Sequence, residues 1–79
     1  ISGLQIECSP VSLQIKTEKK TEDAGVCKIM LDDGSIVEYR SVDVVQEGNY
    51  SNIIRVFSKI IDVNSVKSIE YNGQIVYHR

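Results

Sequence analysis

The sequence has no tryptophan, one phenylalanine, one proline and one histidine among its 79 residues. Residues that favour helices are also scarce, with one Ala and three Leu against eleven Ile and ten Val. β-Branched side chains lose χ1 freedom against the preceding turn of a helix, but they pack well on a pleated sheet. This balance argues against a helical domain and predicts an all-β fold.

Long apolar runs are missing as well. Unbroken apolar stretches are little more than two residues long, whereas a membrane-spanning helix needs about 20. We therefore expect no membrane insertion by this segment. The length allows one small domain, residues 1–79, and the chain begins at Ile1 rather than at a methionine. We expect this domain to be excised from a longer protein.

Charge of one sign is not concentrated anywhere in the chain. Nine Lys and Arg against eleven Asp and Glu give a net charge of −2. Nucleic-acid-binding domains show a basic stripe with interleaved aromatic side chains. The only basic cluster, Lys16, Lys19 and Lys20, is interrupted by Glu18 and followed by further acids. We therefore expect no nucleic-acid partner and no binding to a membrane surface.

Alternating apolar and polar residues predict short strands along most of the chain. The predicted strands cover residues 4–8, 11–16, 26–31, 36–40, 53–57, 66–71 and 74–78. Residues 42–45 either extend the strand at 36–40 or form a strand that follows it. Ser9-Pro10 separates the first two, since proline cannot donate to a strand ladder. Residues 17–25 and 46–52 are predicted as polar surface loops, the first of them mobile. Asp62 is placed to cap a single helical or 3₁₀ turn.

Two hairpins are predicted from their turn residues. A three-residue loop at 32–34 with Gly34 in the left-handed position buries one face of the middle hairpin. It sets Leu31 opposite Ser35, Ile29 opposite Val37, Cys27 opposite Tyr39 and Lys28 opposite Glu38. Asn72-Gly73 predicts the last hairpin in either of two registers. A three-residue loop groups Ile69, Ile75 and Tyr77, and a two-residue turn groups Ile69, Tyr71 and Val76.

These elements predict a small immunoglobulin-like β-sandwich of about six to eight short antiparallel strands, with a barrel as the second choice. The likeness is one of architecture, because the tryptophan of antibody domains is missing.

Catalytic, metal and cofactor chemistry finds little support. His78 is the only histidine and lies next to the chain end, where termini commonly fray. Asp32 and Asp33 occupy turn positions that favour aspartate for local hydrogen bonds. We therefore expect no catalytic residues, no metal site, no cofactor and no enzymatic activity.

Cysteine and tyrosine are the remaining candidates. We interpret Cys8 and Cys27 as small buried side chains on neighbouring strands, and a disulfide between them is the alternative. Tyr39 and Tyr77 are expected in or beside the core. Tyr50 is expected in a loop, where it is a candidate for ligand contact.

Three stretches together carry a family resemblance. They are residues 9–13 (SPVSL), 33–35 (DGS) and 61–69 (IDVNSVKSI), the last ahead of Asn72-Gly73. Over Ile6 to Tyr77 the pattern resembles the C-terminal extracytoplasmic domain of a Firmicutes single-pass membrane-protein family of unknown function, similar to anti-sigma factors. Residues 42–52 and the two cysteines stand outside the pattern. The resemblance implies a non-enzymatic domain on the outer face of a Gram-positive cell membrane, anchored by a transmembrane helix elsewhere in the protein.

We therefore expect a sensory or structural interaction domain of a membrane-anchored, anti-sigma-factor-like regulator. The alternative is a carbohydrate-binding or adhesin module of a secreted protein. A core with one Phe and no Trp is short of large side chains. We expect an exposed apolar strand or patch that packs on a neighbouring domain of the same chain or on a second copy. An envelope component is a further expected partner.

Overall fold

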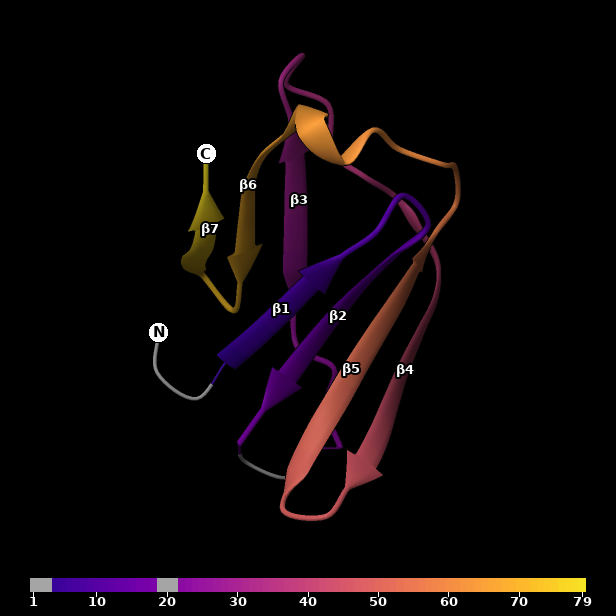
Figure 1. The fold of residues 1–79 in the computed structure, drawn as a ribbon, viewed down its shortest axis with the longest axis vertical. Coiled ribbons are helices and arrows are strands. Elements are labelled where there is room, and N and C mark those ends of the chain that lie inside the picture. The colour runs from indigo at the N-terminus through magenta and orange to yellow at the C-terminus, as the bar shows by residue number, and fades with distance from the viewer. Residues whose placement is uncertain (1–3, 19–21) are drawn as a thin grey trace.

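Seven strands form two antiparallel sheets in the computed structural model, which describes residues 4–18 and 22–79 (Figure 1). The four-stranded sheet has the order β1-β2-β5-β4, and the three-stranded sheet has the order β3-β6-β7. The bounds are β1 Leu4–Cys8, β2 Ser12–Thr17, β3 Cys27–Leu31, β4 Tyr39–Glu47, β5 Tyr50–Phe57, β6 Val66–Tyr71 and β7 Gln74–His78. The predicted all-β sandwich is confirmed.

Both sheets contribute to one apolar core. The alternation of β2 explains its part, since Leu13 and Ile15 are fully buried while Gln14 and Lys16 lie on the other face. The buried apolar residues are Leu13, Ile15, Ile29, Val37, Ile53, Phe57, Val66 and Ile69. Phe57 is therefore the single large aromatic side chain in a core built of aliphatic residues.

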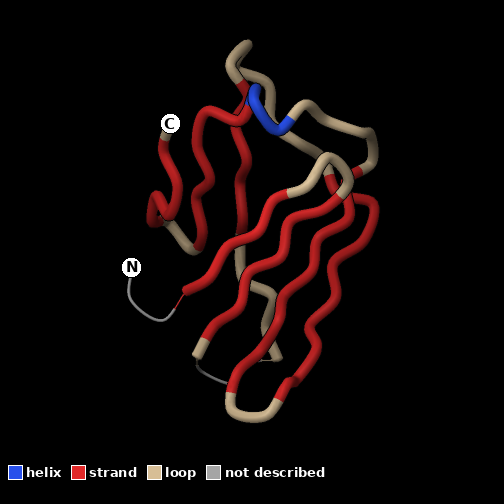
Figure 2. Tube along the Cα trace, viewed as in Figure 1, coloured by secondary structure: helices blue, strands red, loops and turns tan. Residues whose placement is uncertain are grey.

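Two predicted local features are confirmed. The β1–β2 connection turns at Ser9-Pro10, where the backbone N–H of Ser9 donates to the carbonyl of Ser12 at 2.8 Å. Asp62 caps the 3₁₀ turn η1 (Val63–Ser65), its carboxylate accepting from the N–H of Asn64 at 2.9 Å. Figure 2 shows this turn as the helical segment of the described chain.

The predicted turn of the middle hairpin is confirmed, but the strand pairing predicted beyond it is wrong. The N–H of Leu31 donates to Ser35 at 2.9 Å, the N–H of Val37 donates to Ile29 at 3.0 Å, and Gly34 has a φ of +85°. The chain then crosses to the other sheet, where β4 pairs with β5, while β3 pairs with β6. Cys27 therefore lies opposite Tyr71 rather than Tyr39, and Lys28 lies opposite Glu70 rather than Glu38. Alternation indicates which face a strand buries, but not which strand lies beside it.

The predicted loop over 46–52 is also wrong. Glu47 pairs with Tyr50 across a two-residue turn, in which Gly48 has a φ of +61°. β4 therefore ends at Glu47 and β5 begins at Tyr50, with two residues between them. Tyr50 belongs to a strand and not to a loop. The polar composition of residues 46–52 predicts a loop, but polar residues also occupy the solvent face of this sheet, which is why the prediction fails. The other predicted loop, 17–25, includes residues 19–21, which lie outside the described residues. Lys19 and Lys20 of the basic cluster are two of these three residues.

The last hairpin adopts the two-residue register. Tyr71 pairs with Gln74, and both residues of Asn72-Gly73 have positive φ, 51° and 84°, as a type I′ turn requires. Further along, Glu70 pairs with Ile75, but Ile69 pairs with Tyr77. Val76 is therefore the extra residue of a β-bulge.

Candidate functional site

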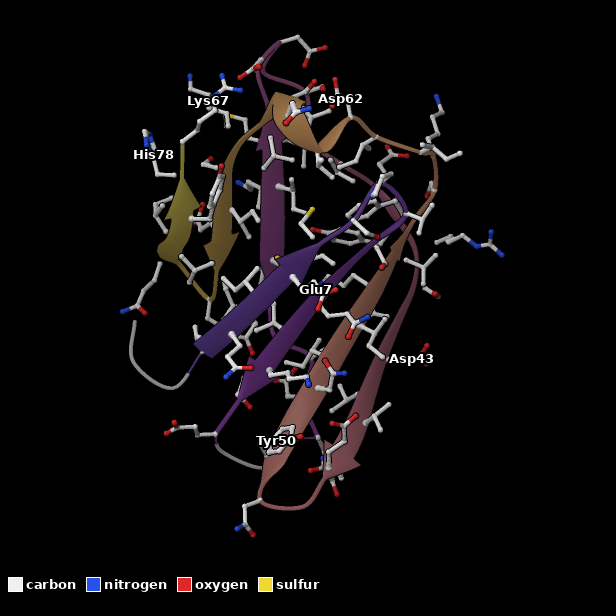
Figure 3. All side chains as sticks on the ribbon, viewed as in Figure 1. Glu7, Asp43, Tyr50, Asp62, Lys67 and His78 are labelled. Atoms are coloured by element: carbon white, nitrogen blue, oxygen red, sulfur yellow. The ribbon has the colours of Figure 1, made fainter. Side chains whose placement is uncertain are left out.

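The acidic and histidine candidates for chemistry are dispersed over the surface. His78 is exposed at the end of β7 (Figure 3). Asp33 accepts from the N–H and the hydroxyl of Ser35 at 2.9 and 2.6 Å, and these bonds hold the pKa of Asp33 below its usual value. Asp32 forms an ion pair with Arg79. Across residues 4–18 and 22–79, no group of three or more His, Cys, Asp and Glu residues is arranged to hold a metal ion, and no helix has the length and apolarity to cross a membrane.

Arg55 is a buried cation that the sequence reading missed. It points inward from β5 with 2% of its surface exposed, and Nη2 donates to the carbonyls of Ala24 and Gly25 at 2.9 and 3.1 Å. Its guanidinium carbon lies 5.7 Å from the centroid of the Tyr39 ring, and Nη1 is buried without a partner. The available signal was the alternation of β5, which places Arg55 on the inward face between Ile53 and Phe57.

Cys8 and Cys27 are free, half-buried thiols. They lie on β1 and β3, which belong to opposite sheets, so the expectation of neighbouring strands is wrong. Burial raises the pKa of both thiols, and the nearby Cys27 raises that of Cys8 further. Both thiols therefore stay protonated at neutral pH. A disulfide between them stays the alternative.

Tyr39 and Tyr77 differ in how close they lie to the core. Tyr39 is half-buried, its ring centroid lies 6.3 Å from that of Phe57, and its hydroxyl donates to the Cys27 carbonyl at 3.0 Å. Burial raises the pKa of the Tyr39 phenol. Tyr77 is 43% exposed and is not among the side chains that pack against the core. The expectation of a place in or beside the core is confirmed for Tyr39 and wrong for Tyr77.

Tyr50 lies on the solvent face of the four-stranded sheet (Figure 3). It is 37% exposed, and the Nζ atom of Lys16 lies 5.7 Å from its ring centroid. The two side chains border a depression of about 300 Å³, completed by Leu4, Gln5, Thr17 and Glu18. Of the sequence candidates, Tyr50 is therefore the one placed beside a surface hollow with polar groups around it.

A second hollow lies where the two sheets meet at their edges. We call this hollow, between the edge strands β1 and β7, the seam. It has a volume of about 260 Å³. The residues that line it are Ile6 and Cys8 of β1, Val63 of η1, Val66 and Ile69 of β6, and Val76 and Tyr77 of β7. The bulge at Val76 explains this lining, because Val76 and Tyr77 both lie opposite Ile69.

A third hollow, of about 470 Å³, lies between the segments 31–38 and 58–65. The exposed Ile60 stands at its rim, but charged and hydroxyl side chains make up much of its lining, including Glu38, Lys59 and Asp62. The seam is lined by apolar side chains apart from one thiol and one phenol, which makes it the stronger candidate for an apolar partner.

Comparison with protein-family models, with curated proteins and with solved structures finds no match for this chain. Function is therefore inferred from the residues and their arrangement.

Proposed function

We propose that this domain is a non-enzymatic interaction module whose seam receives apolar side chains from a neighbouring domain of the same protein. In the setting implied by the sequence resemblance, it stands on the outer face of a Gram-positive membrane. There it forms the extracytoplasmic part of an anchored, anti-sigma-factor-like regulator.

The observation that carries this proposal is the contrast between the floor and the mouth of the seam. Val66 and Ile69 form a buried floor, 3% and 2% exposed, while Tyr77 at the mouth is 43% exposed. Burying apolar surface contributes about 25 cal/mol per Å². A partner that covers the exposed surface of Tyr77 at the mouth gains this free energy, since the floor is already buried.

The bulge indicates how the partner binds. A regular edge strand invites another strand to pair with it, and a bulge disrupts that pairing. Because the bulge at Val76 distorts β7, the edge strand of this sheet, we infer that the partner contributes side chains rather than an added strand.

The size of the seam favours a partner in the same protein. A stable interface between separate proteins buries about 1,600 Å² in total, whereas the seam has room for roughly one or two large apolar side chains. A covalent link supplies an effective concentration of about 1 mM with short linkers, which allows a small contact to persist.

The test uses two variants on one strand. Tyr77→Gln alters the mouth of the seam, and Ile75→Gln alters a residue two positions away that is similarly exposed, 53%, and lines no part of the seam. The remaining extracytoplasmic part of the parent protein is titrated into each by calorimetry. We expect Tyr77→Gln to weaken binding about tenfold and Ile75→Gln to leave it unchanged.

Equal effects of both variants, or no binding by the wild-type domain, would contradict the docking proposal. The location is tested separately, because a parent gene without one membrane-spanning helix would contradict it.

A further inference from the structure

Polar side chains form a row across the solvent face of the four-stranded sheet. Gln5 pairs with Lys16, and Lys16 pairs with Asn52, so the three stand side by side on β1, β2 and β5. Tyr50 lies two residues before Asn52 and therefore on the same face. Figure 3 shows Glu7, Asp43 and Tyr50 on this face.

Asn52 is unusual within this row. Although it points to the solvent side, only 5% of it is exposed. Its Nδ2 donates to Oε1 of Gln14 at 3.3 Å, but its Oδ1 is buried and has no hydrogen-bond partner. A buried amide oxygen without a donor is costly and rare in folded proteins, so it calls for an explanation.

The side chain next to Asn52 on β2 offers an explanation. Lys16 is the register partner of Asn52, and its ammonium group lies over the Tyr50 ring. A lysine side chain is flexible, and a cation–π contact at an exposed ring is weak. Moving this one side chain would uncover the ring face of Tyr50, which lies two residues before Asn52 on the same face.

The surrounding charges restrict the ligand. Among residues 4–18 and 22–79, the depression is lined by one acidic residue, Glu18, and one basic residue, Lys16, and Glu47 is the register partner of Tyr50. This balance of charge among the described lining residues does not favour an anionic ligand. Amide and carboxylate oxygens accept hydrogen bonds, and an aromatic ring takes an apolar surface. A sugar ring offers hydroxyl donors and an apolar C–H face together.

We propose that the depression beside Tyr50 binds a neutral pyranose unit of an oligosaccharide. The C–H face of the sugar stacks on the Tyr50 ring after Lys16 swings aside. One hydroxyl of the sugar donates to Oδ1 of Asn52, and Gln5 and Glu18 accept from others. This site lies on the solvent face of the sheet, apart from the seam, and does not depend on the proposed docking function.

The test is a titration of the ¹⁵N-labelled domain with cellotetraose and with chitotetraose, followed by NMR. We expect saturable shifts at amides of residues 4–5, 16–17 and 50–52. Tyr50→Ala should weaken binding about tenfold, because it removes the stacking surface. Tyr50→Phe should retain binding, and so should Val45→Ala, which alters the exposed neighbour of Asn52 on β4.

Asn52→Leu separates binding from folding. Leucine has a similar size and removes the unpaired oxygen, so the Tm should not fall, yet the affinity should drop about tenfold. An unchanged affinity in Asn52→Leu would overturn the role of Asn52. Absence of shifts with both tetrasaccharides at about 10 mM would overturn the site itself. Binding of an oligogalacturonate in preference to the neutral sugars would overturn the ligand class.

Discussion

Arg55 shows how one buried residue joins separate parts of the chain. Two carbonyls of the segment before β3 accept from its guanidinium, and the Tyr39 ring from β4 lies beside it. Charged groups are rarely buried without such partners, because desolvation disfavours them. The alternation of β5 predicts that Arg55 points inward, but its partners, Ala24 and Gly25, lie about 30 residues away and only the folded chain reveals them.

The buried thiols and phenol predict a loss of stability in alkali. Burial raises the pKa of Cys8, Cys27 and Tyr39. A cysteine thiol in the unfolded chain has a pKa of about 8.5. Above this pH, the unfolded chain releases protons that the folded domain keeps. Ionisation then favours unfolding, so stability is complete below this pH and falls as the pH rises further.

Urea denaturation at intervals between pH 7 and pH 10 measures this effect. We expect the free energy of unfolding to decline above about pH 8.5. The double variant Cys8→Ala, Cys27→Ala should show a shallower decline, because only Tyr39 then contributes. A free energy of unfolding that stays constant or rises over this range would contradict the prediction.

At the scale of the elements, turns were predictable and strand partners were not. Asp33-Gly34 and Asn72-Gly73 signal their turns through residues that tolerate positive φ, which is a local property. β3 pairs with β6, whose residues follow almost forty positions later, and no local pattern encodes that choice. The sequence predicts Tyr50 in a loop, wrongly, for a related reason. The Gly48-Asn49 turn is so short that the polar solvent face of β4 and β5 resembled loop sequence.

Gly25 connects two elements and provides a test of this packing. Its φ is +72°, and an added Cβ would lie 2.6 Å from Oδ1 of Asn72, which accepts from the N–H of Val26 at 2.9 Å. Gly34 has a similar φ of +85° but open space around it. Alanine at either position pays about 1–2 kcal/mol for the left-handed backbone. Gly25→Ala also disturbs the contact between the β6–β7 hairpin and the start of β3.

We therefore expect Gly25→Ala to lower the free energy of unfolding by about 1 kcal/mol more than Gly34→Ala does. Chemical denaturation of both variants beside the wild type measures the difference. Equal losses would show that the Asn72 contact contributes nothing to stability.

At the scale of the whole molecule, two sheets of unequal size leave a hollow between β1, which ends one sheet, and the β6–β7 hairpin of the other. The scarcity of large side chains predicted exposed apolar surface, and ten large apolar side chains of the described residues are exposed. Its location was not predictable. The seam arises because β1 ends one sheet and β7 ends the other, and because a bulge turns Val76 and Tyr77 toward Ile69.

Amide hydrogen exchange tests the docking role of the seam most directly. The exchange rates of this domain alone are compared with those of the same residues in a longer chain that also carries the neighbouring domain proposed to cover the seam. Covering the seam should slow exchange at the free edges of β1 and β7. The Gly48-Asn49 turn, which joins β4 and β5 away from the seam, should keep its exchange rate. Slower exchange in β1 and β7 is the predicted result. Unchanged exchange there, or protection confined to the solvent face around Tyr50, would contradict it.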